Sequence, residues 1–360
     1  MRLHACFAAG VSIPDRAPTV HRAGSLLATV ACVFGATACA SPPPTAIRIA
    51  PHRPPATTTT TTTVATEQAG WTTISRTSTG IAVDTQTLTQ LDGSSMTLVR
   101  FLAGHVTFNL HIGSLEPPTG NAAIGPDSGP MISSAEAPSV LACFNGGFKV
   151  HDHPGGIVTW GQHLTAVEPG LGTFVTDAAG HATVGVWGYG MPNLQNPALN
   201  VRQNLQPLVT QGQINPKVDN VLAWGATFGG GKRVARSGLG EDTFGNIIYV
   251  ASMSTVPADL ARVLVAVGAI NAMQLDINPA TLQMATAAWP GGPLSAQIPG
   301  QQHPSNRCQI GSTRDFVVAL AAPATAPAAP AAPAVPPTVA STPVTRSAGS
   351  TIASGGASGA

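Results

Sequence analysis

The sequence predicts an α+β protein in which β-sheet dominates and helices are few. Three observations support this fold class. Short runs of alternating apolar and polar residues recur between Trp71 and Leu320, only one segment has the spacing of an amphipathic helix, and neither end of the chain has a periodic apolar face that could be buried in a core. The folded part is therefore predicted to be one domain over residues 71–320.

Both ends of the chain have the composition of disordered segments. Residues 39–70 are rich in Pro and Thr and include a run of seven Thr, whereas residues 321–360 are rich first in Ala and Pro and then in Gly and Ser. Such segments bury too little apolar surface to offset the entropy lost on folding. We therefore expect a disordered spacer before the domain and a disordered tail after it.

Residues 1–38 are typical of an export signal. Arg22 precedes an apolar run of about 15 residues, which is shorter than the ~20 residues of a membrane span. The sequence ATAC, which ends at Cys39, resembles the lipobox of bacterial lipoproteins and predicts a lipid anchor on the outer face of the cell membrane. Ordinary signal-peptidase cleavage after Ala38 or Ala40 is the alternative, and it predicts a secreted protein.

The charge of the chain excludes one class of partner. Charged residues make up only 9% of the sequence, and acidic residues outnumber basic ones between residues 71 and 320. Nucleic-acid binding normally needs a clustered basic surface. We therefore expect no nucleic-acid partner.

Alternation of apolar and polar residues predicts the strands. In HVTFNLH, residues 105–111, every second residue is apolar, as in a strand that is buried on one face. Two further pairs of alternating runs flank glycine-containing polar segments at residues 177–180 and 241–246. These two segments predict two hairpins.

One helix is predicted, over STVPADLARVLVAVG. Ser254 or Thr255 would cap it, and Pro257 suits its first turn. Gly268 would end the helix. A strand over residues 269–275 follows directly.

Candidate site residues follow that strand. Asp276 and Asn278 come at its end, where functional residues of sheet-rich proteins usually lie. Because charged residues are rare in this chain, an acid among apolar neighbours needs either a partner or a chemical role. Asp276 is therefore a candidate catalytic group, with Arg236 as the matching cation. The alternative is that these two residues form a structural ion pair.

The segment NGGFK is a second candidate. Gly146 and Gly147 would let the backbone approach a ligand closely. Asn145 can both donate and accept hydrogen bonds, and Lys149 can attract an anion. These four residues are therefore predicted to bind substrate, and the alternative is a tight turn with no ligand.

The segment RQNLQPLVTQGQINP, residues 202–216, is rich in amides. Guanidinium groups suit phosphate, and planar amides suit sugar hydroxyls. Arg202, Gln203 and Asn204 are therefore candidate substrate-binding residues. The alternative is a solvated loop.

Histidine and cysteine residues allow two further interpretations. His151 and His153 could hold a metal if they share one face of a strand, but no matching set of ligands accompanies them, so we expect no metal and no other cofactor. Cys143 and Cys308 are the two cysteines that follow Cys39. A disulfide and two separate buried thiols are equally compatible with the sequence.

Four of these segments together resemble the phosphodiester glycosidase family. They are NGGF from residue 145, RQN from residue 202, RSGLG from residue 236, and the helix and strand that end in Asp276. The segment SNRCQIGSTRDFVVAL also resembles the closing strand of exported actinobacterial members, and the resemblance covers residues 140–320. The chain differs from the family where INP follows Asp276 in place of two glycines, and where Lys149 replaces an aromatic residue.

The resemblance implies an exported hydrolase that acts at the anomeric carbon of a sugar 1-phosphodiester, with a carbohydrate or sugar-phosphate substrate. It implies that Asp276 acts as base or nucleophile and that cationic side chains stabilise the phosphate leaving group. Asp152 and Glu241 are the reserve acids. The alternative function is an envelope lipoprotein that binds a glycan or a phosphorylated polymer without turnover.

Overall fold

The computed structural model describes residues 70–120, 124–193, 195–225 and 230–323, which all belong to one unit of the chain. The predicted signal peptide over residues 1–38, Cys39 and nearly all of the predicted spacer and tail lie outside the described residues. Within the described part β-sheet dominates and there are two α-helices, which confirms the predicted fold class.

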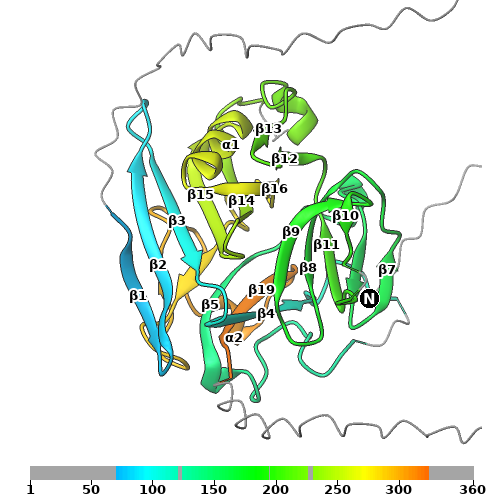
Figure 1. The fold of residues 1–360 in the computed structure, drawn as a ribbon, viewed down its shortest axis with the longest axis vertical. Coiled ribbons are helices and arrows are strands. Elements are labelled where there is room, and N and C mark those ends of the chain that lie inside the picture. The colour runs from blue at the N-terminus through cyan, green and yellow to red at the C-terminus, as the bar shows by residue number, and fades with distance from the viewer. Residues whose placement is uncertain (1–69, 121–123, 194, 226–229, 324–360) are drawn as a thin grey trace, which may run out of the picture. The chain divides into compact units, whose positions relative to one another are not determined.

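The largest sheet has eight strands in the order β1-β2-β3-β15-β14-β16-β12-β13, and every neighbouring pair is antiparallel (Figure 1). Its strands are β1 Thr72–Thr77, β2 Gly80–Thr89, β3 Ser95–Phe101, β12 Pro207–Thr210, β13 Gln213–Ile214, β14 Val234–Asp242, β15 Ile247–Thr255 and β16 Ala269–Gln274. The last of these, β16, leads directly to Asp276.

A six-stranded sheet has the order β10-β9-β8-β11-β6-β7. Its strands are β6 Ile157–Thr159, β7 Gln162–Thr165, β8 Gly172–Thr176, β9 Ala182–Trp187, β10 Gly190–Met191 and β11 Asn200–Gln203. β10 pairs with β9 in parallel, and the other pairs are antiparallel.

A five-stranded sheet has the order β18-β17-β5-β19-β4. Its strands are β4 Val106–His111, β5 Val140–Asn145, β17 Met284–Thr286, β18 Ser295–Ala296 and β19 Phe316–Ala321. The helical elements are α1 Pro257–Ala266, α2 Arg307–Ile310, and three short 3-10 helices, η1 Ala137–Ser139, η2 Val150–Asp152 and η3 Val221–Trp224. None of the helices in the described part is long and apolar enough to cross a membrane.

The main hydrophobic core joins the three sheets. It contains Leu239 of the eight-stranded sheet, Phe144 of the five-stranded sheet and Phe174 of the six-stranded sheet, all nearly inaccessible to solvent. Each such side chain contributes roughly 1.5–3 kcal/mol when it is fully buried. The core therefore fixes the ends of β5, β11 and β16, which carry the predicted site residues.

A second core lies between α1 and the eight-stranded sheet. Leu260 and Leu264 of α1 pack with Leu208 and Ile248. The predicted helix is confirmed, but its predicted cap is wrong. Ser254 and Thr255 still belong to β15, and the residue at the N-cap is Val256, which makes no side-chain capping bond. Strand pairing thus takes precedence over local capping preference at this junction.

The predicted strand and hairpins are present. Residues 106–111 form β4, in which the buried positions alternate as expected as far as Leu110. β8 pairs with β9 across the turn at residues 177–180, and β14 pairs with β15 across residues 243–246. Both turns are stabilised by an aspartate whose carboxylate accepts backbone N–H groups, Asp177 in the first and Asp242 in the second.

Candidate active site

The two glycines after β5 press against buried charged side chains. A Cβ atom at Gly146 would lie 1.9 Å from Asp315 Oδ2, and one at Gly147 would lie 2.7 Å from Arg202 Cζ. Neither glycine has a left-handed φ. We call residues 146–148 the glycine loop. This loop needs glycine for space rather than for backbone freedom, because its backbone approaches a charge pair closely.

That charge pair is fully buried. Arg202 Nε donates to Asp315 Oδ2 over 2.7 Å, and the two side chains are 1% and 0% exposed. The remaining guanidinium nitrogens donate to the carbonyls of Gln203 and Phe148, and Asp315 also accepts the Gly147 N–H. Arg202, which the sequence suggests as a phosphate ligand, is therefore already engaged in holding the glycine loop.

The two amides that follow Arg202 also make protein contacts. Asn204 accepts the Phe148 N–H over 2.9 Å and donates to the carbonyls of Gln274 and Leu275. Gln203 bonds to backbone groups of Gly156 and Glu168. Asn204 thus joins the glycine loop to the end of β16, whereas Gln203 stabilises a turn.

The glycine loop and the end of β16 are in direct contact, as the sequence suggests. The Asp276 N–H donates to the Gly146 carbonyl over 3.1 Å. Asn145 Nδ2 donates to Ser237 Oγ over 3.0 Å, and Ser237 Oγ donates to the Asp276 carbonyl over 3.0 Å. The structure therefore brings Asn145, Gly146 and Asp276 together.

The Asp276 carboxylate is buried and only partly neutralised. Its Oδ2 accepts the Thr281 hydroxyl over 2.7 Å and lies 3.2 Å from Arg314 Nη2, while Oδ1 accepts the Ile277 N–H over 2.7 Å. Burial raises the pKa of Asp276, and Arg314 and the hydrogen bonds counteract that rise only in part. A carboxylate whose charge is costly to bury is a candidate for chemistry.

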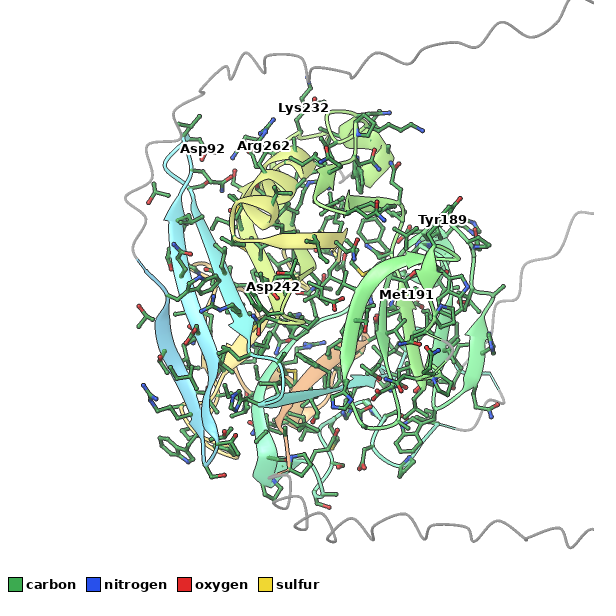
Figure 2. All side chains as sticks on the ribbon, viewed as in Figure 1. Asp92, Tyr189, Met191, Lys232, Asp242 and Arg262 are labelled. Carbon is green, nitrogen blue, oxygen red and sulfur yellow. A yellow bond between two sulfur atoms is a disulfide. The ribbon has the colours of Figure 1, made fainter. Side chains whose placement is uncertain are left out.

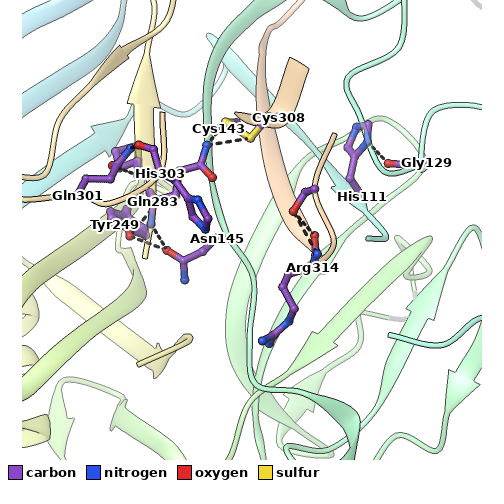
Figure 3. Close-up of a disulfide and its surroundings, with 12 residues drawn as sticks. His111, Gly129, Cys143, Asn145, Tyr249, Gln283, Gln301, His303, Cys308 and Arg314 are labelled. Atoms are coloured by element: carbon purple, nitrogen blue, oxygen red, sulfur yellow. Dashed lines mark hydrogen bonds between the residues drawn. A yellow bond between two sulfur atoms is a disulfide. The ribbon is translucent and has the colours of Figure 1, made fainter. Parts of the chain in front are cut away.

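Two hydrogen bonds hold the side-chain oxygen of Asn145 in place (Figure 3). The Tyr249 hydroxyl donates to Asn145 Oδ1 over 2.8 Å, and the Gln283 N–H donates to the same oxygen over 3.2 Å. Complete burial raises the pKa of Tyr249, so it stays a neutral donor. The Asn145 amide is therefore held in one orientation.

A disulfide joins two of the segments around the site. Cys143 of β5 and Cys308 of α2 are bonded, with their Cα atoms 6.6 Å apart, and Gln283 Nε2 donates to both sulfurs over 3.3 Å (Figure 3). Of the two possibilities that the sequence allows, the structure shows the disulfide. The bond ties the segment that carries Arg307 to the strand that carries Asn145.

These residues enclose a small polar cavity. It is lined by Asn145, Gly146, Asp276, Thr281, Gln283, His303, Arg307, Ser312, Arg314, Asp315 and Phe316. Its free volume is about 10 Å³, which is roughly the space of one water molecule. Burial and the neighbouring Arg307 lower the pKa of His303, which favours the neutral imidazole. We call this the Asp276 pocket.

Arg236 lies outside the Asp276 pocket. It is next to Ser237 on β14, and neighbouring strand residues point to opposite faces. Its guanidinium donates to the Trp224 carbonyl and to Gln274 Oε1, both over 2.9 Å, and burial lowers its pKa to about 10. The suggested structural pair between Arg236 and Asp276 does not form, because the ionic partner of Asp276 is Arg314.

The remaining predicted residues are at the surface or belong to turns. Lys149 and Asn278 are exposed, and the Asn278 side chain accepts the Ala280 N–H within a turn. His151 lies in η2 rather than on a strand, and His153, which follows, has a left-handed φ of 52°. Within the described ranges no three or more His, Cys, Asp or Glu side chains are grouped as metal ligands would be.

Sequence reasoning missed several residues of the site. Arg314 and Asp315 both contact the glycine loop, and Tyr249, Thr281 and Gln283 complete the surroundings of Asn145 and Asp276. One signal could have found the first two. They are adjacent charged residues directly before the apolar strand FVVAL, in a chain where charged residues are scarce.

Comparisons with known proteins give a distant likeness of fold. No protein-family model matches the sequence, and no curated protein matches it at a significant level. The catalytic domain of zebrafish N-acetylglucosamine-1-phosphodiester alpha-N-acetylglucosaminidase, described as auto-inhibited by its pro-peptide, is 15% identical with a TM-score of 0.43, and the match covers 70% of this chain and 87% of that one. A hypothetical protein from Synechocystis is 14% identical with a TM-score of 0.41, and the match covers 67% of this chain and 62% of that one.

Proposed function

We propose that the protein hydrolyses a sugar 1-phosphodiester in the Asp276 pocket. One observation carries this proposal. Asp276 is a buried carboxylate with a raised pKa, and two guanidinium groups, those of Arg307 and Arg314, line the same pocket. Asp315 also lines it, but Arg202 compensates that charge. The pocket therefore has an excess of positive charge around one reactive carboxylate, which suits a phosphate group.

The proposed chemistry is attack at the anomeric carbon. Asp276 acts as base toward water or as nucleophile, and the phosphate leaves with its charge stabilised by Arg307 and Arg314. Most glycosidases use two carboxylates because a sugar alkoxide leaves poorly without a proton. A phosphate leaving group relaxes this requirement, so one carboxylate is sufficient. Asn145 positions the loop beside Asp276, because its side-chain amide makes all of its hydrogen bonds within the protein.

The second candidate function is binding of a glycan or a phosphorylated polymer without turnover. It is favoured by the small free volume of the Asp276 pocket, about 10 Å³, and by the 6% exposure of Asp276. A substrate can reach the carboxylate only if the segment with His303, Arg307 and Arg314 moves outward. A protein that only binds would not need this opening.

Isotope labelling distinguishes the two functions and also the bond that breaks. The full chain is incubated in heavy-oxygen water with UDP-N-acetylglucosamine and with glucose 1-(methyl phosphate). Hydrolysis at the anomeric carbon places the heavy oxygen in the free sugar. Heavy oxygen in the phosphate would show phosphodiesterase chemistry instead and contradict the proposal. No release of sugar from either compound would favour the binding function.

We also propose that the protein is exported and is anchored to the membrane through Cys39. This proposal rests on the apolar segment and the ATAC sequence, which lie outside the described residues. Stable anchoring requires more than one acyl chain, as the diacyl group of a lipidated cysteine provides. Cys39→Ala should move the protein from the membrane fraction to the medium. Unchanged fractionation would contradict lipid attachment.

A further inference from the structure

A second cavity, on the six-stranded sheet, differs from the Asp276 pocket in size and chemistry. It has a volume of about 520 Å³, within the range of about 300–1,000 Å³ that is usual for ligand pockets. It lies along β9 and β10 and extends to the β12–β13 hairpin and β16, with lining residues that include Thr183, Tyr189, Met191, Thr210, Gln211 and Asn271. We call it the β9–β12 groove.

The groove is lined by both apolar and polar groups and carries no charge. Among the described residues that line it there is no carboxylate, guanidinium, ammonium or imidazole group. Its polar side chains are instead hydroxyls and amides, those of Thr183, Tyr189, Thr210, Gln211 and Asn271. Such groups both donate and accept hydrogen bonds and therefore match the hydroxyls of a neutral sugar.

Tyr189 provides an aromatic surface in the lining of the groove. It is 75% exposed, although Tyr249, the other tyrosine of the chain, is completely buried. Gly188 and Gly190 flank it with left-handed φ values of 83° and 79°, so the chain turns sharply at this residue. Tyr189 and Met191 both line the groove, and Figure 2 labels them in the region of the six-stranded sheet. An exposed, rigid ring with a hydroxyl at its tip suits the mixed apolar and polar faces of a sugar.

Gln211, which also lines the groove, is held in a strained backbone conformation. Its φ is 50° in the two-residue turn between β12 and β13, where Asn or Gly is usual. Its N–H donates to Asn271 Oδ1 over 3.2 Å, while its side-chain amide bonds to no other described residue. The turn would form more easily with glycine, so the glutamine side chain is retained at a conformational cost.

The part of β9 that β10 leaves unpaired is closed to an incoming peptide strand. The Val184 N–H, in this part of β9, donates to Glu241 Oε2 over 2.7 Å. A peptide that paired with β9 would have to displace this carboxylate. The groove therefore favours a ligand that bonds to side chains rather than to the backbone.

We propose that the β9–β12 groove binds a short stretch of a neutral oligosaccharide. Tyr189 stacks against the C–H face of a sugar ring, and the amides of Gln211 and Asn271 bond to its hydroxyls. The amide-rich segment 202–216 thus contributes to a glycan site through Gln211 rather than through Arg202. This site is independent of the proposed hydrolysis, because the two cavities share no lining residue.

The test is a binding titration of the full chain with four neutral hexasaccharides, namely maltohexaose, cellohexaose, mannohexaose and chitohexaose. At least one should bind with a Kd below about 1 mM. Tyr189→Ala should weaken that binding at least tenfold. Gln211→Gly should weaken it about threefold to tenfold while the melting temperature stays equal or rises, because glycine suits the turn. Phe244→Ala is the matched control, since Phe244 is 81% exposed and lies outside the groove.

Two further measurements complete the test. Binding is compared at low and high salt, and it is compared with the binding of a charged sugar and of an extended peptide. Binding of a neutral sugar to an uncharged groove should not change between low and high salt. The proposal is overturned if none of the four hexasaccharides binds, if Tyr189→Ala binds as well as the parent protein, or if hexagalacturonate or an extended peptide binds more tightly than every neutral sugar. Hydrolytic activity plays no part in these outcomes, so failure here and failure of the hydrolase proposal can be told apart.

Discussion

Two arginine–carboxylate pairs contact the same glycine loop, and they differ in how completely each charge is neutralised. Arg202 and Asp315 are 2.7 Å apart and 1% and 0% exposed, and Asp315 also accepts the Gly147 N–H. Arg314 and Asp276 are 3.2 Å apart, and their side chains alone are 13% and 8% exposed. Arg314 also donates to the Gly147 carbonyl, and its Nε is buried with no partner in the described part of the chain.

Burial alone therefore does not identify a reactive group. Asp315 is the more deeply buried acid, yet Arg202 neutralises its charge and the Gly147 N–H donates to it. Its role is to position the glycine loop. Asp276 retains a raised pKa because burial outweighs the stabilisation that Arg314 and the hydrogen bonds provide. A site therefore requires a charge that is buried and incompletely satisfied, next to groups that can bind the substrate.

The largest effect on stability is expected at the satisfied pair. Asp315→Asn leaves the Arg202 guanidinium buried without a counter-charge, which should lower the free energy of unfolding by about 3–5 kcal/mol. Urea denaturation measures this loss. The double variant Arg202→Met/Asp315→Leu is the control, because it removes both charges and should recover the part of the loss that comes from the unpaired charge, while the Gly147 N–H and the Phe148 carbonyl still lose their partners. A loss below about 1 kcal/mol for Asp315→Asn would show that the pair does not hold the loop.

A smaller loss is expected when the loop is moved away from the pair. Gly146→Ala places a methyl group 1.9 Å from Asp315 Oδ2, so the loop or the carboxylate must shift, at a cost of about 1–3 kcal/mol. Gly129→Ala is a matched control, since it has no neighbour within 4 Å of the new Cβ atom and no left-handed φ. Equal stability of the two variants in urea would contradict the close approach.

The glycine loop and Asp276 could be predicted from the sequence, but their partners could not. NGG and an acid at a strand end are local patterns, and each is visible within a few residues. Asp315 is 113 residues from Arg202, and Arg314 is also distant from Asp276 in the sequence. No local pattern predicts these two contacts, because each depends on how strands of different sheets meet. Arg236 illustrates the same limit, since strand alternation turns it away from Ser237 and hence from Asp276.

Glu241 is a half-buried acid that has no arginine partner among the described residues, unlike Asp315 and Asp276. Burial raises the pKa of Glu241 from 4.5 to about 7. The folded protein therefore keeps this proton up to about pH 7, whereas the unfolded chain releases it near pH 4.5. The free energy of unfolding should fall as the pH rises between these two values.

Glu241→Gln should remove the part of this fall that comes from Glu241. Above pH 7 the variant should be more stable than the parent protein by about 1–2 kcal/mol, a value discounted for the partial exposure of the side chain, and the two should be equally stable near pH 4. Thermal or urea unfolding across this pH range measures the difference. A difference that stays constant with pH would show that the carboxylate does not titrate in this way.

The central claim is that Asp276 is the reactive group, and stability and turnover measured together on Asp276→Asn test it most directly. The substitution keeps the shape and the hydrogen bond from the Ile277 N–H, and it removes a charge that is costly to bury. The expected result is an unchanged urea midpoint with turnover of the sugar phosphodiester lowered at least about a hundredfold, in contrast to Asp315→Asn, which loses stability first. An Asp276→Asn protein that unfolds as early as Asp315→Asn, with activity lost only in proportion, would contradict the account.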